Sequence, residues 1–207
     1  MSVVHQLVRR VRYGKPIVVV SGLPRSGTSM AMKMLDAGGM PILTDGVRGP
    51  DDSNPRGYYE LEAVKQLHTL HDTAWLDDAR GKAVKIVSFL VTWLPETYDY
   101  RVIFMQRDLR EVIASETTML VKRGQEIQAA SEEQTQKVYE QHLAKVERFL
   151  SSRRCFSTLI VSYRDALERP EEAARRMRDF VGRRLDVGQM AGVADPALYR
   201  NRVEPGR

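Results

Sequence analysis

The chain has 207 residues, of which 43% are hydrophobic and 29% charged, so its length and composition indicate one globular domain with a substantial core. Its net charge of +5 favours an anionic ligand or an acidic substrate, and on charge alone nucleic acid is also compatible. The single cysteine, Cys155, excludes an intramolecular disulfide and a cysteine-based zinc site in this chain.

Residues 1–15 are predicted to form an N-terminal helix with apolar residues such as Leu7 and Val11 on one face and arginines beside them. We expect this helix to pack on the edge of the domain; the alternative is a basic amphipathic helix lying on a membrane surface. No apolar stretch has the length of a membrane-spanning helix or the position of a signal-peptide core. We therefore expect a cytosolic protein without an integral membrane segment.

A phosphate-binding turn is predicted where the β-branched strand 17–21 runs into a glycine-bracketed loop and then a helix. Gly22 and Gly27 occupy the glycine places of the P-loop pattern G-x-x-x-x-G-K-[ST], but Thr28 stands in the lysine place and Arg25 supplies a cation inside the loop. Such a loop can hold a phosphate through backbone N–H groups, hydroxyls and a guanidinium, yet it lacks the lysine that reaches the terminal phosphates of ATP. The alternative interpretation is a tight turn whose glycines serve only backbone geometry.

The helix that starts near Gly27 is predicted to end at the glycine pair Gly38-Gly39. The stretch 44–58 that follows is rich in glycine, proline and asparagine. We expect this stretch to be a mobile loop on the acceptor side of the site. A helix is predicted from Glu60 to about His71. Its His68 and His71 form an H-x-x-H pair without a third ligand, so packed or surface histidines are predicted rather than a metal site.

Strands and helices alternate along the rest of the chain, which predicts an α/β fold with three layers, α/β/α, around a central, doubly wound parallel sheet of the P-loop nucleotide-binding type. The further strands are predicted at 83–87, 100–106 and 156–162, and the further helices at 108–122, 131–152 and 170–182. The side chains of the helix 131–152 that we expect to face the core are Val138, His142 or Leu143, Val146 and Leu150.

One domain is predicted over residues 1–207. It comprises the N-terminal helix 1–15, a core at 17–183 and a C-terminal appendage at 184–207. No internal repeat or low-complexity segment divides it.

A second anion site is predicted at the end of the strand 100–106, where Arg107 is followed eight residues later by Ser115. In an open α/β sheet, ligands bind outside the carboxyl ends of the strands, so Arg107 and Arg25 should open onto the same crevice. Two phosphate sites, each with a cation and a hydroxyl, indicate a ligand that carries phosphates at both ends of a nucleoside. The alternative is a local ion pair between Arg107 and Asp108 at the start of a helix.

Three blocks of the sequence, Pro24-Arg25-Ser26-Gly27-Thr28-Ser29, Arg107 to Ser115 and Val161 to Glu171, together resemble sulfotransferases that use 3′-phosphoadenosine 5′-phosphosulfate (PAPS). The resemblance runs from about residue 17 to residue 183. It implies a parallel sheet flanked by helices, no metal, and adenosine 3′,5′-bisphosphate as the product. The positions that it implies for cofactor contacts are Pro24, Arg25, Ser26, Gly27, Thr28 and Ser29 at the 5′-phosphosulfate, Arg107 and Ser115 at the 3′-phosphate, and Tyr163 near the adenine.

The chain departs from the family pattern at the catalytic base. Lys85-Ile86-Val87 resembles the Lys-Thr-His triplet of many relatives, with the lysine retained and Val87 in the histidine place. Other branches of the family use a glutamate, and Glu60 is the candidate here; it could equally favour the first turn of its helix through the helix dipole. The resemblance thus implies Glu60, Arg25 and Lys85 as catalytic residues. The family's glycine-rich C-terminal clamp on the 3′-phosphate is not recognisable.

These observations favour an in-line transfer of a sulfuryl group to a hydroxyl or amine of a small-molecule or glycan acceptor, with a carboxylate base. Two alternatives stay open: a kinase-like phosphotransferase in which Asp108 binds magnesium, and a catalytically silent homologue that keeps only the nucleotide site. The stretches 44–58 and 88–98 are expected to shape the acceptor pocket. Nucleic acid is not expected as a partner, because Trp75 and Trp93 suit a core or an acceptor pocket better than a base-stacking platform.

Overall fold

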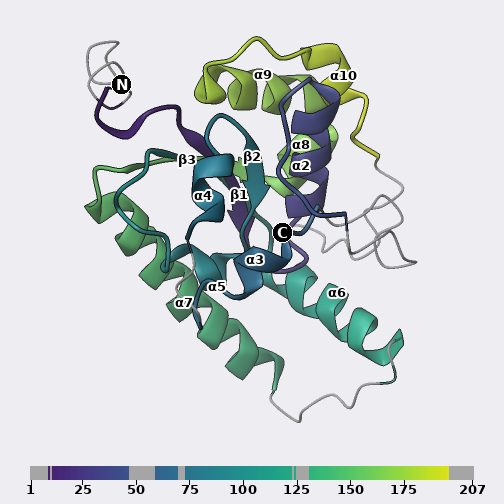
Figure 1. Cartoon of the computed structure of the whole chain (residues 1–207). Helices are drawn as coiled ribbons and strands as arrows, with labels where there is room; N and C mark the ends of the chain where they lie inside the picture. The colour runs from purple at the N-terminus through teal and green to yellow at the C-terminus, as the bar shows by residue number, and fades with distance from the viewer. Residues whose placement is uncertain are drawn as a thin grey trace.

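The computed structural model describes residues 9, 11–46, 59–69, 73–122, 124 and 131–195. Its centre is a sheet of four parallel strands in the order β2-β1-β3-β4 (Figure 1). The strands are β1 (Ile17–Gly22), β2 (Ala83–Lys85), β3 (Tyr100–Gln106) and β4 (Phe156–Ser162). The sequence prediction of an α/β fold with a parallel sheet is confirmed. Two strand ends differ from the prediction: β1 extends to Gly22 instead of 21, and β2 ends at Lys85 instead of 87, because Val87 already precedes a short helix as its N-cap.

Helices cover both faces of the sheet (Figure 1). One face carries α2 (Thr28–Ala37), α8 (Tyr163–Glu168), α9 (Pro170–Val181) and α10 (Val187–Ala191). The other carries α3 (Glu62–Lys65), α4 (Trp75–Asp78), α5 (Ser88–Val91) and α7 (Glu132–Ser152). The remaining helix, α6 (Leu109–Lys122), follows β3 and packs against α7. Because both faces are covered, all six residues of β1 are buried, as in other parallel sheets.

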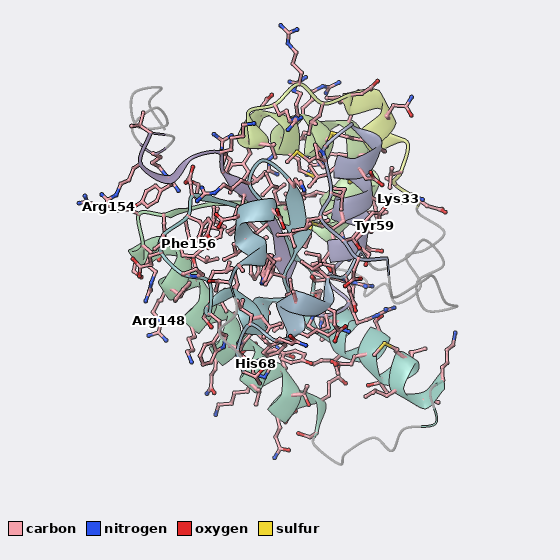
Figure 2. All side chains as sticks on the ribbon, in the orientation of Figure 1. Lys33, Tyr59, His68, Arg148, Arg154 and Phe156 are labelled. Atoms are coloured by element: carbon pink, nitrogen blue, oxygen red, sulfur yellow. The ribbon has the colours of Figure 1, made fainter. Side chains whose placement is uncertain are left out.

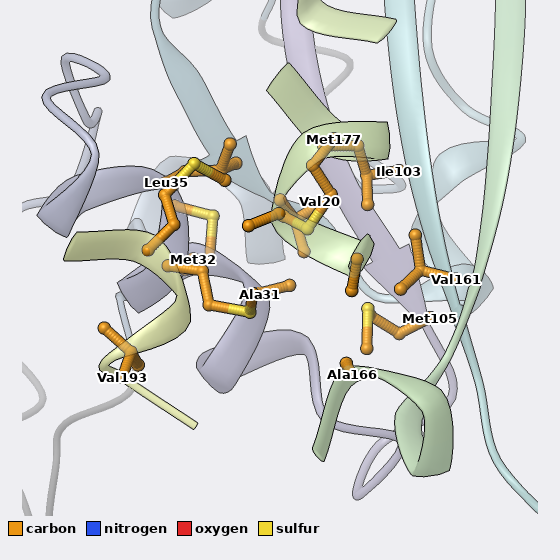
Figure 3. Close-up of a cluster of buried hydrophobic side chains, with 14 of the residues drawn as sticks. Val20, Ala31, Met32, Leu35, Ile103, Met105, Val161, Ala166, Met177 and Val193 are labelled. Atoms are coloured by element: carbon orange, nitrogen blue, oxygen red, sulfur yellow. The ribbon is translucent and has the colours of Figure 1, made fainter. Parts of the chain in front are cut away.

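Alternate residues of β1 enter two separate cores, as the two-residue period of a strand requires. Val18 and Val20 point into the core that α2, α9 and α10 close, which Figure 3 shows. Ile17 and Val19 point into the core beneath α4, α5 and α7. The central strand thereby fixes the helical layers relative to one another and to the loop at its own carboxyl end.

The strand order creates the place where a ligand can bind. The chain leaves β1 for β2 on one side and then returns to β3 on the other, so the connections diverge at the carboxyl ends of β1 and β3. In open α/β sheets such a divergence leaves a crevice, and ligands bind there. The loop after Gly22 and the residues after Gln106 both border this crevice.

Two helical predictions need correction. The helix predicted from Glu60 to His71 is the single turn α3, and residues 66–69 continue as turns closed by bonds such as Leu67 N to Val64 O, in the tighter i to i−3 pattern. His71 lies outside the described residues. Val138 of α7 is 59% exposed and does not face the core. The first turns of α7 extend beyond the carboxyl edge of the sheet and pack beside α6, where the Tyr139 hydroxyl bonds Glu116 (Figure 1).

The two ends of the described chain are joined to the domain. Met190 of α10 is fully buried against Gly38, and the backbone N–H of Asp186 donates to Gly38 O at 3.1 Å. At the other end, the Arg9 guanidinium donates to Cys155 O at 2.6 Å and forms an ion pair with Asp99. Within the described residues, no helix is both long and apolar enough to cross a membrane.

Candidate active site

The loop between β1 and α2 is held so tightly that its two glycines have no room for a side chain. At Gly27, the N-cap of α2, φ is +99° and an added Cβ would overlap Cδ2 of the Tyr163 ring. At Gly22 an added Cβ would lie 2.6 Å from the backbone oxygen of Met105 on β3. Both glycines therefore meet a backbone requirement, which the tight-turn interpretation needs. It is also compatible with a phosphate loop, since such loops need the same close approach.

Two polar features of this loop point to an anion. Arg25 has φ +67°, and among the described residues only it and Tyr59 are non-glycine residues with positive φ. Such strain concentrates at functional sites. The Ser26 hydroxyl is buried and has no hydrogen-bond partner among the residues that the structure describes, an arrangement that native proteins avoid unless another group completes it. An anion in the loop would accept this bond.

The two anion sites predicted from the sequence meet in one hydrogen-bonded network. Arg25 Nε donates to Ser115 Oγ at 3.0 Å, across from the loop to α6. Arg107 Nη1 donates to the backbone oxygen of Arg25, also at 3.0 Å. The Arg107 guanidinium lies over the ring of Tyr163, 4.6 Å from its centroid. Tyr163 thus packs against the loop at Gly27 and supports the second arginine.

A buried carboxylate that the sequence analysis did not assign to the site holds Arg107 in place. The Glu111 side chain is 1% exposed; it accepts from Arg107 Nε at 2.9 Å and lies 3.4 Å from Arg164. The predicted ion-pair partner of Arg107 was Asp108, which instead pairs with Arg110 at 2.9 Å. That hydrogen bond lowers the pKa of Asp108. The spacing of four residues from Arg107 to Glu111 was the available signal, because Arg107 lies just before α6 and Glu111 lies in its first turn.

The third cluster lies on the other side of β1. Lys85 Nζ, at the end of β2, is 3.4 Å from Ser29 Oγ and 3.7 Å from Glu60 Oε1, and its side chain is 8% exposed. Glu60 also lies 3.8 Å from Lys65. The contact between Lys85 and Ser29 follows from the register that places Lys85 beside Val20 of β1. Glu60, Lys85 and the helix end of the loop are thus brought together.

Hydrogen bonds at Glu60 and at the preceding residue hold this part of the backbone in place. Glu60 lies two residues before α3, ahead of the N-cap Leu61, so it is not in the first turn of a helix as the helix-dipole alternative requires. Its backbone oxygen accepts from Thr44 Oγ1 at 2.7 Å. The preceding Tyr59, with φ +50°, donates its hydroxyl to Asp36 of α2 at 2.9 Å, and Figure 2 shows it beside that helix. Burial, followed by this bond, raises the pKa of Tyr59 to about 12.

An apolar cavity of about 420 Å³ lies between α7 and the strands β3 and β4 and extends to Ser26 and Arg107 at the crevice. No group of three or more histidine, cysteine, aspartate or glutamate side chains that could hold a metal occurs within the described ranges. Residues 47–58 of the predicted acceptor-side loop lie outside those ranges.

Comparison with known proteins decides the family. The family model described as "Sulfotransferase domain" matches residues 15–201. The chain belongs to the sulfotransferase family. A solved structure, that of a sulfotransferase from Alicyclobacillus acidocaldarius, shares its fold with a TM-score of 0.53 at 16% sequence identity, covering 89% of this chain and 88% of that one. No curated protein matches the chain.

Because it belongs to this family, the protein is a transferase of sulfuryl groups. The family generally takes these groups from PAPS. The structure places the predicted contacts of the sulfotransferase in two groups. The first group lies on one side of the loop and comprises Arg25, Arg107, Ser115 and Tyr163. The second lies on the other side, at Ser29, and comprises Lys85 and Glu60. The roles of these residues in binding and catalysis stay predictions.

Proposed function

We propose that this sulfotransferase moves a sulfuryl group from PAPS to a hydroxyl or amine of a small-molecule or glycan acceptor, with Glu60 as the base. The observation that carries the proposal is the bond from Arg107 to the backbone oxygen of Arg25, together with the bond from Arg25 to Ser115. These bonds join two cation-and-hydroxyl sites in one crevice. A donor with phosphate groups at both ends of a nucleoside matches such a pair.

The residues of the loop fit the donor's phosphosulfate end. The buried hydroxyl of Ser26 has no partner within the described part of the chain, and Thr28 and Ser29 are the first two residues of α2. Backbone N–H groups at a helix N-terminus favour an anion. Thr28 in the lysine place leaves the loop short of the charge that a nucleoside triphosphate requires.

PAPS, when bound, supplies an activated sulfuryl group and a leaving group whose negative charge grows during transfer. The guanidinium of Arg25, the ammonium of Lys85 and the loop N–H groups would stabilise that charge. The carboxylate of Glu60, 3.7 Å from Lys85, would accept the proton of the acceptor hydroxyl or amine. In-line transfer of this kind depends on positioning and charge more than on covalent catalysis.

Binding of adenosine 3′,5′-bisphosphate tests the nucleotide assignment. In titration calorimetry without magnesium, we expect the wild type to bind this bisphosphate in preference to ATP and 5′-AMP. Arg107→Ala should weaken binding by about 10- to 100-fold, the range for a hydrogen bond to a charged group. Arg110→Ala is the matched control, because Arg110 lies three residues after Arg107, in the first turn of α6, but pairs with Asp108 at the surface.

Absence of bisphosphate binding, together with ATP binding that requires magnesium, would contradict the proposal and favour the kinase-like alternative. Because Arg107→Ala leaves the buried Glu111 with fewer partners, its folding is checked by circular dichroism before the titration.

Arg25→Ala tests charge stabilisation in the loop. We expect turnover of PAPS to fall by about 10²- to 10³-fold, as on removal of one donor to a developing oxyanion. The rate is measured as release of adenosine 3′,5′-bisphosphate with whichever phenol, alcohol or amine of a panel gives the fastest turnover of the wild type. Arg25→Lys, which keeps the charge, should retain more activity than Arg25→Ala; equal rates for wild type and Arg25→Ala would remove Arg25 from the catalytic set.

A further inference from the structure

A groove of about 770 Å³ lies between α5 and α7, on a part of the surface that the crevice does not reach. Its lining includes Phe89, Trp93, His142 and Phe149, but none of the loop residues, Lys85 or Glu60. Its size is that of a small-ligand site. Phe89 and Trp93 belong to the stretch 88–98 that the sequence predicts at the acceptor pocket, but the groove that they line shares no residue with the loop, Lys85 or Glu60.

The floor of this groove is aromatic and open to solvent. Phe89 is 42% exposed and Trp93 is 47% exposed, and both line the groove although large apolar side chains at a surface are usually covered or functional. The Phe89 ring stacks on His142 with centroids 4.1 Å apart and an interplanar angle of 20°. Together they present flat rings in a fixed arrangement to anything that enters.

The arrangement is anchored in the protein interior. His142 Nε2 is 2.9 Å from the hydroxyl of Ser88, which is fully buried at the start of α5. Burial, and then the charge of Lys145, lower the pKa of His142, which favours the neutral imidazole as the stacking partner of Phe89. At the far end, the Arg153 guanidinium lies 3.9 Å from the centroid of the Phe149 ring. The aromatic surface is thus built before any ligand binds.

The rim of the groove is cationic. Lys145, Arg148 and Arg153 line it, and no carboxylate does among the described residues of its wall. Outside that wall, Glu96 pairs with Arg153 at 2.8 Å. Arg148 lies on the outer flank of α7 (Figure 2). The charge at the rim complements an anion, and the rings below complement a flat apolar body.

We propose that the groove between α5 and α7 binds an aromatic anion, with its rings against Phe89 and Trp93 and its carboxylate or similar acidic group toward Lys145 and Arg148. This site is separate from the cofactor crevice and does not depend on the proposed roles of Glu60 or Arg25. It gives the protein a second ligand-binding surface whose specificity combines ring stacking with charge.

The test uses 2-naphthoate as the probe and 2-naphthamide as its neutral isostere. Binding to the full chain is measured by calorimetry in the presence of saturating adenosine 3′,5′-bisphosphate, so that the crevice is filled. We expect 2-naphthoate to bind, and 2-naphthamide to bind about two- to fivefold more weakly, the upper part of the range for a solvent-exposed charge pair. Trp93→Ala should weaken 2-naphthoate binding about tenfold.

Lys145→Gln and Arg148→Gln should each weaken 2-naphthoate binding about two- to fivefold and leave 2-naphthamide binding unchanged. Lys137→Gln is the matched control, because Lys137 is an exposed cation of the same helix outside the groove. Equal affinity of wild type and Trp93→Ala, or equal affinity for naphthoate and naphthamide, would overturn the proposal. Capture by phosphatidylserine vesicles without any binding of 2-naphthoate would overturn it as well and would assign the surface to a membrane.

Discussion

Replacing Glu60 by glutamine is expected to slow turnover of PAPS by about 10²- to 10⁴-fold, the contribution of a positioned general base. The change keeps the shape of the side chain and removes its ability to accept a proton. Lys85, 3.7 Å away, keeps its contact with Ser29 at 3.4 Å, so the loop should stay intact. Affinity for adenosine 3′,5′-bisphosphate, measured by calorimetry, should therefore be within a factor of about three of the wild-type value.

Glu62→Gln is the matched control for this experiment. Glu62 lies two residues further along, and its carboxylate is 2.8 Å from Lys65, which Glu60 also approaches at 3.8 Å. A general loss of negative charge around Lys65 would slow both variants alike. If Glu60→Gln turned over like the wild type while binding the bisphosphate normally, Glu60 would not be the base, and the fold and family would be unaffected.

Gly27→Ala is expected to destabilise the protein by about 3 kcal/mol or more, because it combines backbone strain with overpacking. The residue has φ +99°, and the new methyl group would overlap the Tyr163 ring. To relieve the overlap the ring must move, and the Arg107 guanidinium that lies over it loses its support. The free energy of unfolding is measured by guanidinium denaturation, and affinity for the bisphosphate should fall with it.

Gly39→Ala separates the two causes. Gly39 has φ +88°, similar to Gly27, but an added Cβ there meets nothing within 4 Å. It should therefore cost only the strain of a left-handed backbone, about 1–2 kcal/mol. Equal destabilisation by the two substitutions would show that the tight packing of the loop against Tyr163 does not contribute to stability.

The sequence predicted the framework well because buried parallel strands and capped helices leave strong local patterns. The strands 100–106 and 156–162 were predicted with their observed bounds, and so was the end of α9 at Gly182. The helices α4 and α5 were not predicted, because four residues are too few to show a helical period of apolar side chains. The helix after Glu60 was predicted too long because its apolar spacing is helical, whereas its bonds close three residues apart.

The candidate site was predictable in part for the same reason. The meeting of Arg25 and Arg107 followed from the general rule that ligands bind outside the carboxyl ends of parallel strands. The role of Glu111 did not follow, because a glutamate in a first helical turn also suits the helix dipole, and only the fold buries it between Arg107 and Arg164. The contact of Lys85 with Ser29 depends on strand order, which no local pattern encodes.

The position of β1 between β2 and β3 has a consequence for the selection of nucleotides. Lys85 ends the strand on one side of β1 and Arg107 follows the strand on the other, so two strand spacings, about 10 Å, separate the strands that carry these two residues. Because hydrogen bonds fix the spacing of strands in a sheet, the separation of the two strand ends is also fixed. If Lys85 and Arg107 bind the cofactor as proposed, a nucleotide with charge at one end only would pair with one of these cations and leave the other in water. The spacing of the strands would then contribute to discrimination against such nucleotides.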